Sequence, residues 1–369
     1  MTELRAGIGT ADITPVEAVR LAGFLAREPA VPSLHVADPL QVRAIALRRG
    51  EDTALLLVLD LVGLSAAFSA PLRLAVASAT GVPVERVLTS CTHTHSGPDT
   101  LLGMDLHEGY PELLHAGAVA AALDALASLV PVVVGVADVA VPVELAVNRR
   151  GTPHAPRLQL LDLHGPSGRV ASVVGVGIHP VTHGPDVHLV TADWVGHCRT
   201  AVEAALGGTA VVVSGALGDV NPPGGDGYDR SGGGVELARS VGSAVADLAV
   251  AASARTEDAG GGLQLDHRTV ELPVADTELA RLVSGGVDSV VTELFDWTVG
   301  DVHLVSMPGE PLGAFAADVH REGRVLPVGL APSWQGYLPH PDALAGGYED
   351  ELGLGAPAMR LLLDALGEA

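Results

Sequence analysis

Short runs of Val, Leu and Ile alternate along the chain with longer, alanine-rich segments. Several of the short runs are almost continuously apolar, which is typical of strands buried on both faces. We expect strands at 53–59, 84–90, 132–136, 157–163, 170–178, 210–214 and 301–306. Helical spacing predicts helices over 111–128, 194–206 and 235–252, and Asp193 and Gly207 stand where the second helix needs its N-cap and C-cap. The alternation indicates an α/β fold.

The composition is that of a packed globular protein. The chain has 369 residues, of which 48% are hydrophobic and 18% charged, so it can bury a substantial core. No linker marks a domain boundary, and we therefore expect one domain over residues 1–369. The Gly-rich segment at 223–234 cannot be regular structure; it is either a surface loop or a lid over a nearby site.

The balance of charge excludes several functions. The chain carries 44 acidic and 21 basic residues, a net charge of −23, and every basic residue is an arginine. Without lysine there is no pyridoxal Schiff base, no Walker-type phosphate loop, no kinase lysine and no carbamylated lysine bridging two metals. The excess of negative charge disfavours nucleic acid and anionic membranes as partners.

The cysteines and the N-terminus indicate a cytoplasmic protein. Cys91 and Cys198 are too few for a disulfide framework, which favours reduced thiols. The N-terminus lacks the pattern of a secretion signal. The longest apolar stretch, 126–147, is interrupted by Pro and acidic residues, so we do not expect it to span a membrane.

The densest group of reactive side chains is Ser-Cys-Thr-His-Thr-His-Ser-Gly-Pro at 90–98, directly after a predicted strand. Residues two apart on a strand face the same way, so His93 and His95 are expected to project together from its carboxyl end. A second apolar strand ends at His179, and a third is followed by a Pro-Gly turn that presents Glu310. Two histidines and one carboxylate are typical ligands of a catalytic Zn²⁺, which activates water near neutral pH. This set predicts a zinc-dependent hydrolase.

The chain resembles the neutral/alkaline ceramidase family of zinc-dependent amidases, and its short bacterial members in particular. Motifs that match this family occur in the family's order at 6–15, 92–98, 148–149, 178–180, 192–193, 218–222, 307–310 and 337–349. The resemblance implies an α/β catalytic domain in which mixed β-sheets pack together and are flanked by α-helices. It also implies hydrolysis of an amide, a non-peptide C–N bond.

The resemblance assigns further roles residue by residue. It makes His93, His179, Glu310 and Tyr337 the zinc ligands. The second motif histidine, His95, is then the group that takes a proton from the metal-activated water and passes it to the leaving amine. Two further residues, Arg149 and Tyr348, match groups that hold the substrate carbonyl and its oxyanion.

Some features depart from the family. We expect neither the secretion signal nor the C-terminal immunoglobulin-like domain of the long ceramidases. The segments around Tyr337 read Ser-Trp-Gln-Gly and Leu-Pro-His-Pro in place of the family's Asn- and Thr-rich stretch, and His183 and His188 follow His179 where apolar or amide side chains are expected. With its acidic charge and few aromatics, the chain is poorly suited to extracting a membrane lipid. We therefore expect a soluble, non-ceramide amide as substrate and no stable membrane association.

Three alternatives remain open at this point. One is a catalytically inactive ceramidase-like protein that binds a metabolite or a partner. Another is a metal-dependent esterase or lactonase. The third, a metallo-β-lactamase-like or barrel amidohydrolase site, is disfavoured because 92–99 lacks the Asp-His pair of the first class and His-x-His is not on the first strand, as the second requires. A homo-oligomer is left open by the sequence.

Overall fold

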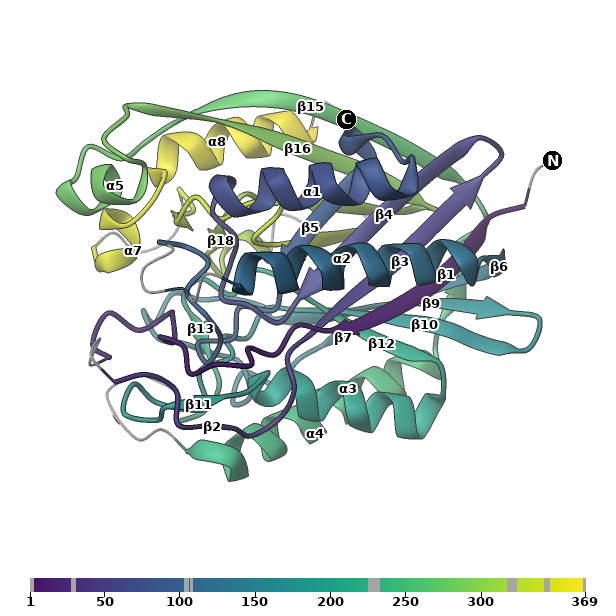
Figure 1. Ribbon diagram of the computed structural model, residues 1–369, viewed down its shortest axis with the longest axis horizontal. Coiled ribbons are helices and arrows are strands. Elements are labelled where there is room, and N and C mark those ends of the chain that lie inside the picture. Colours follow the sequence, from purple (N-terminus) through teal and green to yellow (C-terminus); the bar gives the residue numbers. More distant parts are fainter. Residues whose placement is uncertain are drawn as a thin grey trace.

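The computed structural model arranges the chain in stacked layers (Figure 1). It describes residues 3–27, 31–102, 106, 109–224, 233–316, 324–341 and 346–367. In this part of the chain, two five-stranded sheets pack face to face, and a pair of helices covers the outer face of each sheet. The α/β fold with packed mixed sheets and flanking helices, predicted from the sequence, is confirmed.

The first sheet has the strand order β5-β4-β3-β1-β6. Its strands are β1 (Arg5–Asp12), β3 (Gln41–Arg49), β4 (Asp52–Leu59), β5 (Val87–Cys91) and β6 (Val130–Pro131). The pair β4 and β5 is parallel, whereas β1, β3 and β4 form an antiparallel meander. Helices α1 (Ala66–Thr80) and α2 (Tyr110–Ala127) cover its outer face. A short 3-10 turn, Val84–Arg86, leads into β5.

The second sheet has the order β12-β10-β9-β7-β14. Its strands are β7 (Val133–Ala140), β9 (Arg157–Gly165), β10 (Gly168–Val176), β12 (Thr209–Ser214) and β14 (Glu257–Asp258). Only β10 and β12 pair in parallel among the neighbours described for this sheet. Helices α3 (Asp193–Leu206) and α4 (Gly234–Ser253) pack on its outer face.

A third sheet and several short pairings complete the fold. The third sheet, in the order β15-β16-β17-β19, consists of β15 (Leu263–Pro273), β16 (Ser289–Val299), β17 (Val302–Ser306) and β19 (Val325–Val328). It shares a core with α8 (Gly355–Gly367), near α5 (Glu278–Val283) and α7 (Tyr348–Glu351). The two-residue strands pair as β2 (His35–Val36) with β11 (Leu189–Val190), β8 (Val147–Asn148) with β13 (Val220–Asn221), and β18 (Glu310–Pro311) with β20 (Tyr337–Leu338).

Most of the expected elements are present, and two expectations were wrong. The strand expected from residue 84 begins at Val87, because the chain first makes the Val84–Arg86 turn. Asp193 is the first residue of α3 and not its N-cap; its φ is 56°, and its carboxylate bonds to the preceding loop. Gly207 does end that helix, with a φ of 70°. Most of the loop at 223–234 lies outside the described residues, and the prediction of a single domain over 1–369 stays a prediction.

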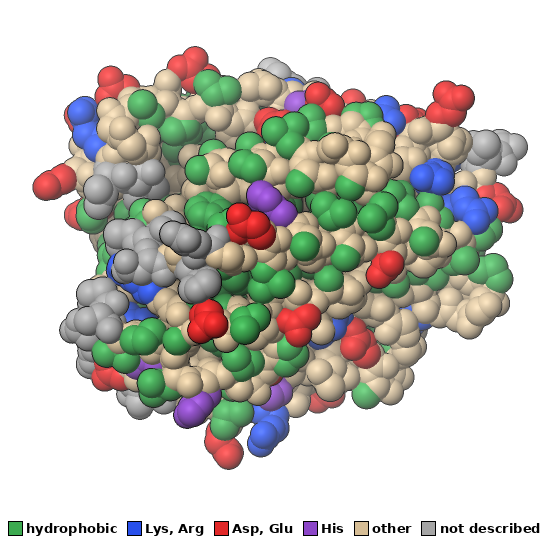
Figure 2. All heavy atoms as spheres, viewed as in Figure 1, with side chains coloured by type: hydrophobic (Ala, Val, Ile, Leu, Met, Phe, Trp, Pro, Cys, Tyr) green, Lys and Arg blue, Asp and Glu red, His purple; other side chains and the backbone are tan. Residues whose placement is uncertain are grey.

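The surface reflects the excess of acidic residues and the high share of hydrophobic residues in the sequence. Acidic side chains are scattered over the face formed by α1 and α2, and hydrophobic side chains lie between them (Figure 2). Among the described helices, none combines the length and the apolar character needed to cross a bilayer. Both cysteines are free and buried.

The close packing of α2 on β1 generates a prediction about stability. A Cβ atom added at Gly9 would lie 2.1 Å from the carbonyl oxygen of Ala121 in α2, so the helix backbone would have to move. We expect Gly9→Ala to lower the free energy of unfolding by about 1–3 kcal/mol, measured by urea denaturation. The control is Gly261→Ala, because a Cβ there meets nothing within 4 Å. Equal stability of the two variants would contradict this account of the packing.

Candidate metal centre and active site

Three chain segments meet where strands of different sheets end. His93 follows β5 of the first sheet, His179 follows β10 of the second, and Glu310 begins β18. His93 and His95 were expected to face the same way because residues two apart on a strand do so, and this reason was wrong: β5 ends at Cys91, and His93 has a φ of 72°. This left-handed turn still brings the two imidazoles together, because their Nε2 atoms lie 3.3 Å apart.

Four side chains converge on one point. The Nε2 atom of His93 lies 3.2 Å from Nε2 of His179 and 3.3 Å from Oε2 of Glu310. The same Oε2 atom lies 3.3 Å from Nε2 of His179. All four side chains, including His95, are buried, at 2–8% exposure. The ligand atoms of the three histidines lie within 4.8 Å of one another, as in a metal site.

Backbone carbonyls fix the protonation of two of these rings. Nδ1 of His179 lies 2.7 Å from the carbonyl oxygen of Leu217, and Nδ1 of His93 contacts the carbonyl oxygen of Val62. A carbonyl only accepts, so each Nδ1 must carry the proton and each neutral ring leaves a lone pair on Nε2. Those two lone pairs face each other and face Oε2 of Glu310, to which no described residue donates a hydrogen bond. Three acceptors in close contact repel one another unless a cation lies between them.

The spacing fits a metal ion. Atoms bound to a tetrahedral zinc ion at about 2.0–2.1 Å lie about 3.3 Å apart. The three contacts among His93, His179 and Glu310 measure 3.2–3.3 Å. The carbonyls on the two Nδ1 atoms are the outer partners that metal-bound histidines usually have. The buried donors therefore fit a divalent metal ion such as zinc.

Burial and mutual contact shift the ionisation of these groups. Burial lowers the pKa of His179, which keeps its Nε2 lone pair available. By itself burial would raise the pKa of Glu310, but the positive charge that His93 and His179 carry when protonated outweighs burial and holds the pKa well below its usual range. A neutral imidazole and an ionised carboxylate are the forms that bind metals.

His95 lies beside the other three side chains, in contact with the segment that contains Gly23 and Phe24. Its ring contacts those of His93 and His179, with centroids 4.8 and 5.6 Å away, and its Nδ1 has no hydrogen-bond partner among the described residues. The ring of Phe24 packs edge-on against it at 4.7 Å, and a Cβ at Gly23 would come within 2.3 Å of it. Burial, with the two other histidines, lowers the pKa of His95 well below its usual value. His95 is thus neutral and can accept a proton.

Two tyrosines and an arginine form a neighbouring cluster. The register of β18 and β20 places Tyr337 beside Glu310. The rings of Tyr337 and Tyr348 meet edge-on at 5.6 Å, and the Arg149 guanidinium lies 4.5 Å from the Tyr348 ring centre. Burial and the charge of Glu310 raise the pKa of Tyr337 well above its usual value, and burial raises that of Tyr348 to about 12. Both phenols therefore stay protonated at neutral pH.

The described contacts of Arg149 are internal. One guanidinium nitrogen pairs with buried Glu349, and another donates to the carbonyl oxygen of Gly218 at 2.5 Å. Burial alone would lower the pKa of Arg149, but Tyr337, Tyr348 and Glu349 together raise it. The arginine therefore joins the segment after β8 to α7, and its guanidinium supports the ring of Tyr348.

A cavity of about 240 Å³ opens beside the convergent side chains. His93, His95, Glu310 and Tyr337 contribute to its polar end. Most of the remaining lining is apolar, namely Leu21, Ala22, Phe24, Leu25, Val62, Leu101, Leu102, Leu279, Trp334 and Leu352. Arg20 and Asp99 also reach it. The site therefore combines a metal-type donor set with a mainly apolar chamber.

Several groups that support the site could not be predicted from the sequence. The carbonyls of Val62 and Leu217 carry no sequence signal, because every residue has a carbonyl. Arg27 donates to the carbonyl oxygen of His95 at 2.7 Å and to that of Ala22 at 2.9 Å, which holds the segment over the site. The indole of Trp334 donates to Oε1 of Glu310 at 2.7 Å. The only feature of the sequence that pointed to Trp334 was its position three residues before Tyr337, in a segment rich in Gly and Pro.

The two loop histidines after His179 lie outside the convergent set. His183 is buried, and its Nδ1 lies 3.2 Å from the carboxylate of Asp193. The same carboxylate accepts from the hydroxyl of Thr182 at 2.8 Å, and the indole of Trp194 donates to the carbonyl oxygen of His179 at 3.1 Å. The start of α3 thereby holds the loop that carries His179.

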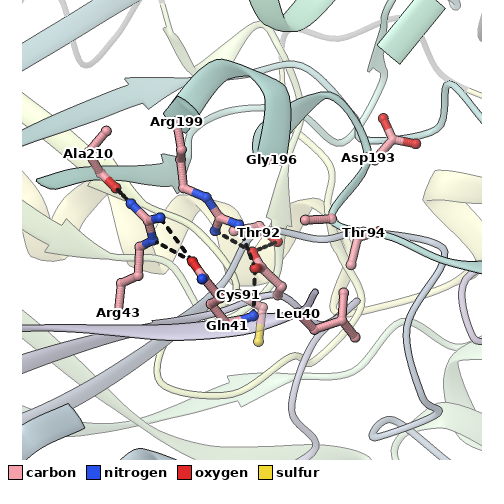
Figure 3. Close-up of polar contacts among 12 residues, drawn as sticks. Leu40, Gln41, Arg43, Cys91, Thr92, Thr94, Asp193, Gly196, Arg199 and Ala210 are labelled. Atoms are coloured by element: carbon pink, nitrogen blue, oxygen red, sulfur yellow. Dashed lines mark hydrogen bonds and ion pairs between the residues drawn. The ribbon is translucent and has the colours of Figure 1, made fainter. Parts of the chain in front are cut away.

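A buried ion pair lies beneath the His93 turn. Arg199 of α3 donates to both carboxylate oxygens of Asp60, at 2.7 and 2.8 Å, and both side chains are almost fully buried. Figure 3 shows Arg199 beside Thr92, with Arg43 linking Gln41 to Ala210. The hydroxyl of Thr92 donates to Asp60 at 3.2 Å. This pair therefore connects the second sheet's helix to the residue that precedes His93.

Comparison with known proteins identifies the fold. The structure is similar to the crystal structure of neutral ceramidase from Pseudomonas aeruginosa, with a TM-score of 0.82, 17% sequence identity, and coverage of 99% of this chain and 73% of that one. It is also similar to a ceramidase complexed with C2, with a TM-score of 0.79, 17% identity, and coverage of 99% and 74%. No family profile matches the chain, and no curated protein sequence matches it significantly. The ceramidase-like fold predicted from the ordered motifs is confirmed.

The buried ion pair yields a second prediction. Removing one partner leaves an uncompensated buried charge, which costs about 3–5 kcal/mol. We expect Arg199→Met to lower the free energy of unfolding by this amount in urea denaturation. The control is Arg324→Met, because Arg324 pairs with Asp301 at the surface and such pairs contribute about 1 kcal/mol or less. A loss no larger than that of the control would show that the pair does not stabilise the fold.

Proposed function

We propose that this protein is a zinc-dependent hydrolase that cleaves the amide bond of a soluble N-acyl compound. One observation carries the proposal: two imidazole lone pairs and a carboxylate oxygen face one another at 3.2–3.3 Å inside the protein. The fold shared with the two ceramidases, one of them a neutral ceramidase, supports amide hydrolysis over other metal-dependent reactions.

In this proposal some residues bind the metal and others take part in the reaction. His93, His179 and Glu310 would hold the metal, and Tyr337 beside Glu310 would complete its ligands. Bound there, zinc supplies Lewis acidity, which lowers the pKa of a coordinated water to about 7 and polarises a carbonyl. His95 is the proton carrier in this scheme: its neutral ring accepts the proton of the attacking water and returns it to the leaving amine.

Tyr348 is the proposed donor to the developing oxyanion. Its phenol remains protonated at neutral pH, and its side chain is partly exposed. Arg149 acts beside it: the guanidinium, held by Glu349 and Gly218, stacks on the ring and contributes positive charge. Both residues would thereby stabilise the charge that forms on the substrate carbonyl.

The cavity supports a substrate other than ceramide. Its volume of about 240 Å³ lies below the roughly 300–1,000 Å³ of clefts that enclose drug-sized molecules. It can hold one modest apolar group next to the histidines, which favours a substrate smaller than a lipid with two chains. The charge of −23 likewise disfavours anionic membranes and nucleic acid as partners. The free thiols of Cys91 and Cys198 fit a reducing cytoplasm.

The first test of this proposal is metal content. We expect the purified protein to bind one zinc ion per chain, to lose acyl p-nitroanilide hydrolysis on chelation and to regain it with zinc. His93→Ala should lose both zinc and activity, because His93 takes part in two of the three close contacts of the site. The control, His115→Ala on the outer helix α2, should keep both.

The outcomes separate the alternatives. Stoichiometric zinc without turnover of amides or esters would favour a binding protein. Cleavage of esters or lactones alone would identify the other hydrolase class. Undiminished hydrolysis by His93→Ala would overturn the proposed site.

A second test concerns the oxyanion. We expect Tyr348→Phe to lower kcat by about 10²–10³-fold, because it deletes one donor to the transition state while leaving zinc content unchanged. The matched control is Tyr110→Phe: Tyr110 is buried in α2, and its hydroxyl has no hydrogen-bond partner among the residues that the structure describes. A kcat for Tyr348→Phe within twofold of this control would remove Tyr348 from the mechanism.

A further inference from the structure

Trp334 joins two parts of the site that have different tasks. Its backbone N–H donates to the carbonyl oxygen of Leu64 at 2.7 Å, which fixes the segment before β20 against the chain after β4. Its indole Nε1 donates to Oε1 of Glu310 at 2.7 Å. Its side chain also lines the 240 Å³ cavity. One residue therefore touches both the donor set and the chamber beside it.

The indole hydrogen bond makes the two oxygens of Glu310 unequal. Oε1 accepts from Trp334, whereas Oε2 has no hydrogen-bond donor in the described part of the chain and lies 3.3 Å from Nε2 of both His93 and His179. A carboxylate free to rotate about its last bond presents either oxygen, or both, to a cation. With Oε1 held, Glu310 presents one defined oxygen to the point where the histidines converge.

Trp334 forms a wall of the chamber, and the base of its side chain packs against the backbone. A Cβ added at Gly63 would lie 3.1 Å from Cβ of Trp334 and 2.9 Å from Cδ2 of Leu101, so these two side chains pack on the backbone of Gly63. Both of them line the cavity. Because protein interiors are close-packed, a wall that rests on the backbone sets the space available and does not yield to a longer ligand.

We propose that Trp334 positions Glu310 for metal binding through its N–H and limits the acyl group of the substrate through its ring. The substrate class that follows is amides of short or medium aliphatic acids. This inference rests on the proposed function and deepens it, since it names the group that enters the chamber. The two roles use different atoms of one side chain, so they can be separated by substitution.

The experiment compares three variants with the wild type. Trp334→Phe removes the N–H donor but keeps an aromatic wall. Trp334→Ala removes both. Leu101→Ala enlarges the chamber on the neighbouring wall and leaves the contact with Glu310 intact. Each protein is assayed for zinc affinity by titration against a competing chelator, and for hydrolysis of acyl p-nitroanilides from acetyl to palmitoyl. Circular dichroism confirms that each variant is folded.

The expected results form a crossed pattern. Trp334→Phe binds zinc about 10- to 100-fold more weakly, as is usual for the loss of an outer hydrogen bond to a ligand, and keeps its preferred chain length. Leu101→Ala binds zinc like the wild type but prefers longer acyl chains. Trp334→Ala shows both changes.

The inference and the proposed function can fail separately. Wild-type zinc affinity in Trp334→Phe overturns the positioning role, and an unchanged acyl preference in Trp334→Ala overturns the limiting role. A wild-type preference for palmitoyl over all shorter chains overturns the substrate class. If the wild type neither binds zinc nor hydrolyses any anilide, the proposed function itself fails, and the inference fails with it.

Discussion

The repulsion among three hydrogen-bond acceptors is the constraint on which the site depends. Two imidazole nitrogens and a carboxylate oxygen are packed at 3.2–3.3 Å with their lone pairs directed at one another. Carbonyl groups behind the rings prevent the histidines from relieving this contact by changing tautomer. The surrounding fold must therefore hold these groups against their own electrostatics, and the energy of doing so is recovered when a cation binds.

The layered architecture supplies the necessary rigidity. His93 and His179 each follow a strand of a different sheet, and the two sheets share a core of large apolar side chains. Helix α3 holds both histidine-bearing segments in place. Its Arg199 pairs with Asp60 beneath the His93 turn, and its Asp193 carboxylate bonds to the loop after His179. Glu310 enters from a third segment, whose partner strand begins with Tyr337. The site is thus defined by how the layers fit together, not by any one loop.

The sequence was sufficient to identify the residues of the site, but not their backbone conformation or their contacts. Strand ends followed by histidines, and a Pro-Gly-Glu turn, were enough to select His93, His179 and Glu310, because apolar strands of an α/β protein bring such ends together. Strand periodicity gave the wrong conformation for the His93 to His95 step, since it does not anticipate a left-handed residue. Asp193 looked like a helix cap because caps and loop-binding carboxylates use the same residue type. The roles of Trp334 and Arg27 depend on contacts between segments far apart, which no local pattern encodes.

The distance in sequence between Glu310 and the histidines has a thermodynamic consequence. Glu310 lies more than two hundred residues after His93, so the donor set exists only when both sheets and the later segment have assembled. An ion that binds this assembly but not the open chain adds its binding free energy to the stability of the whole domain. The metal supply would then set how much of the chain is folded.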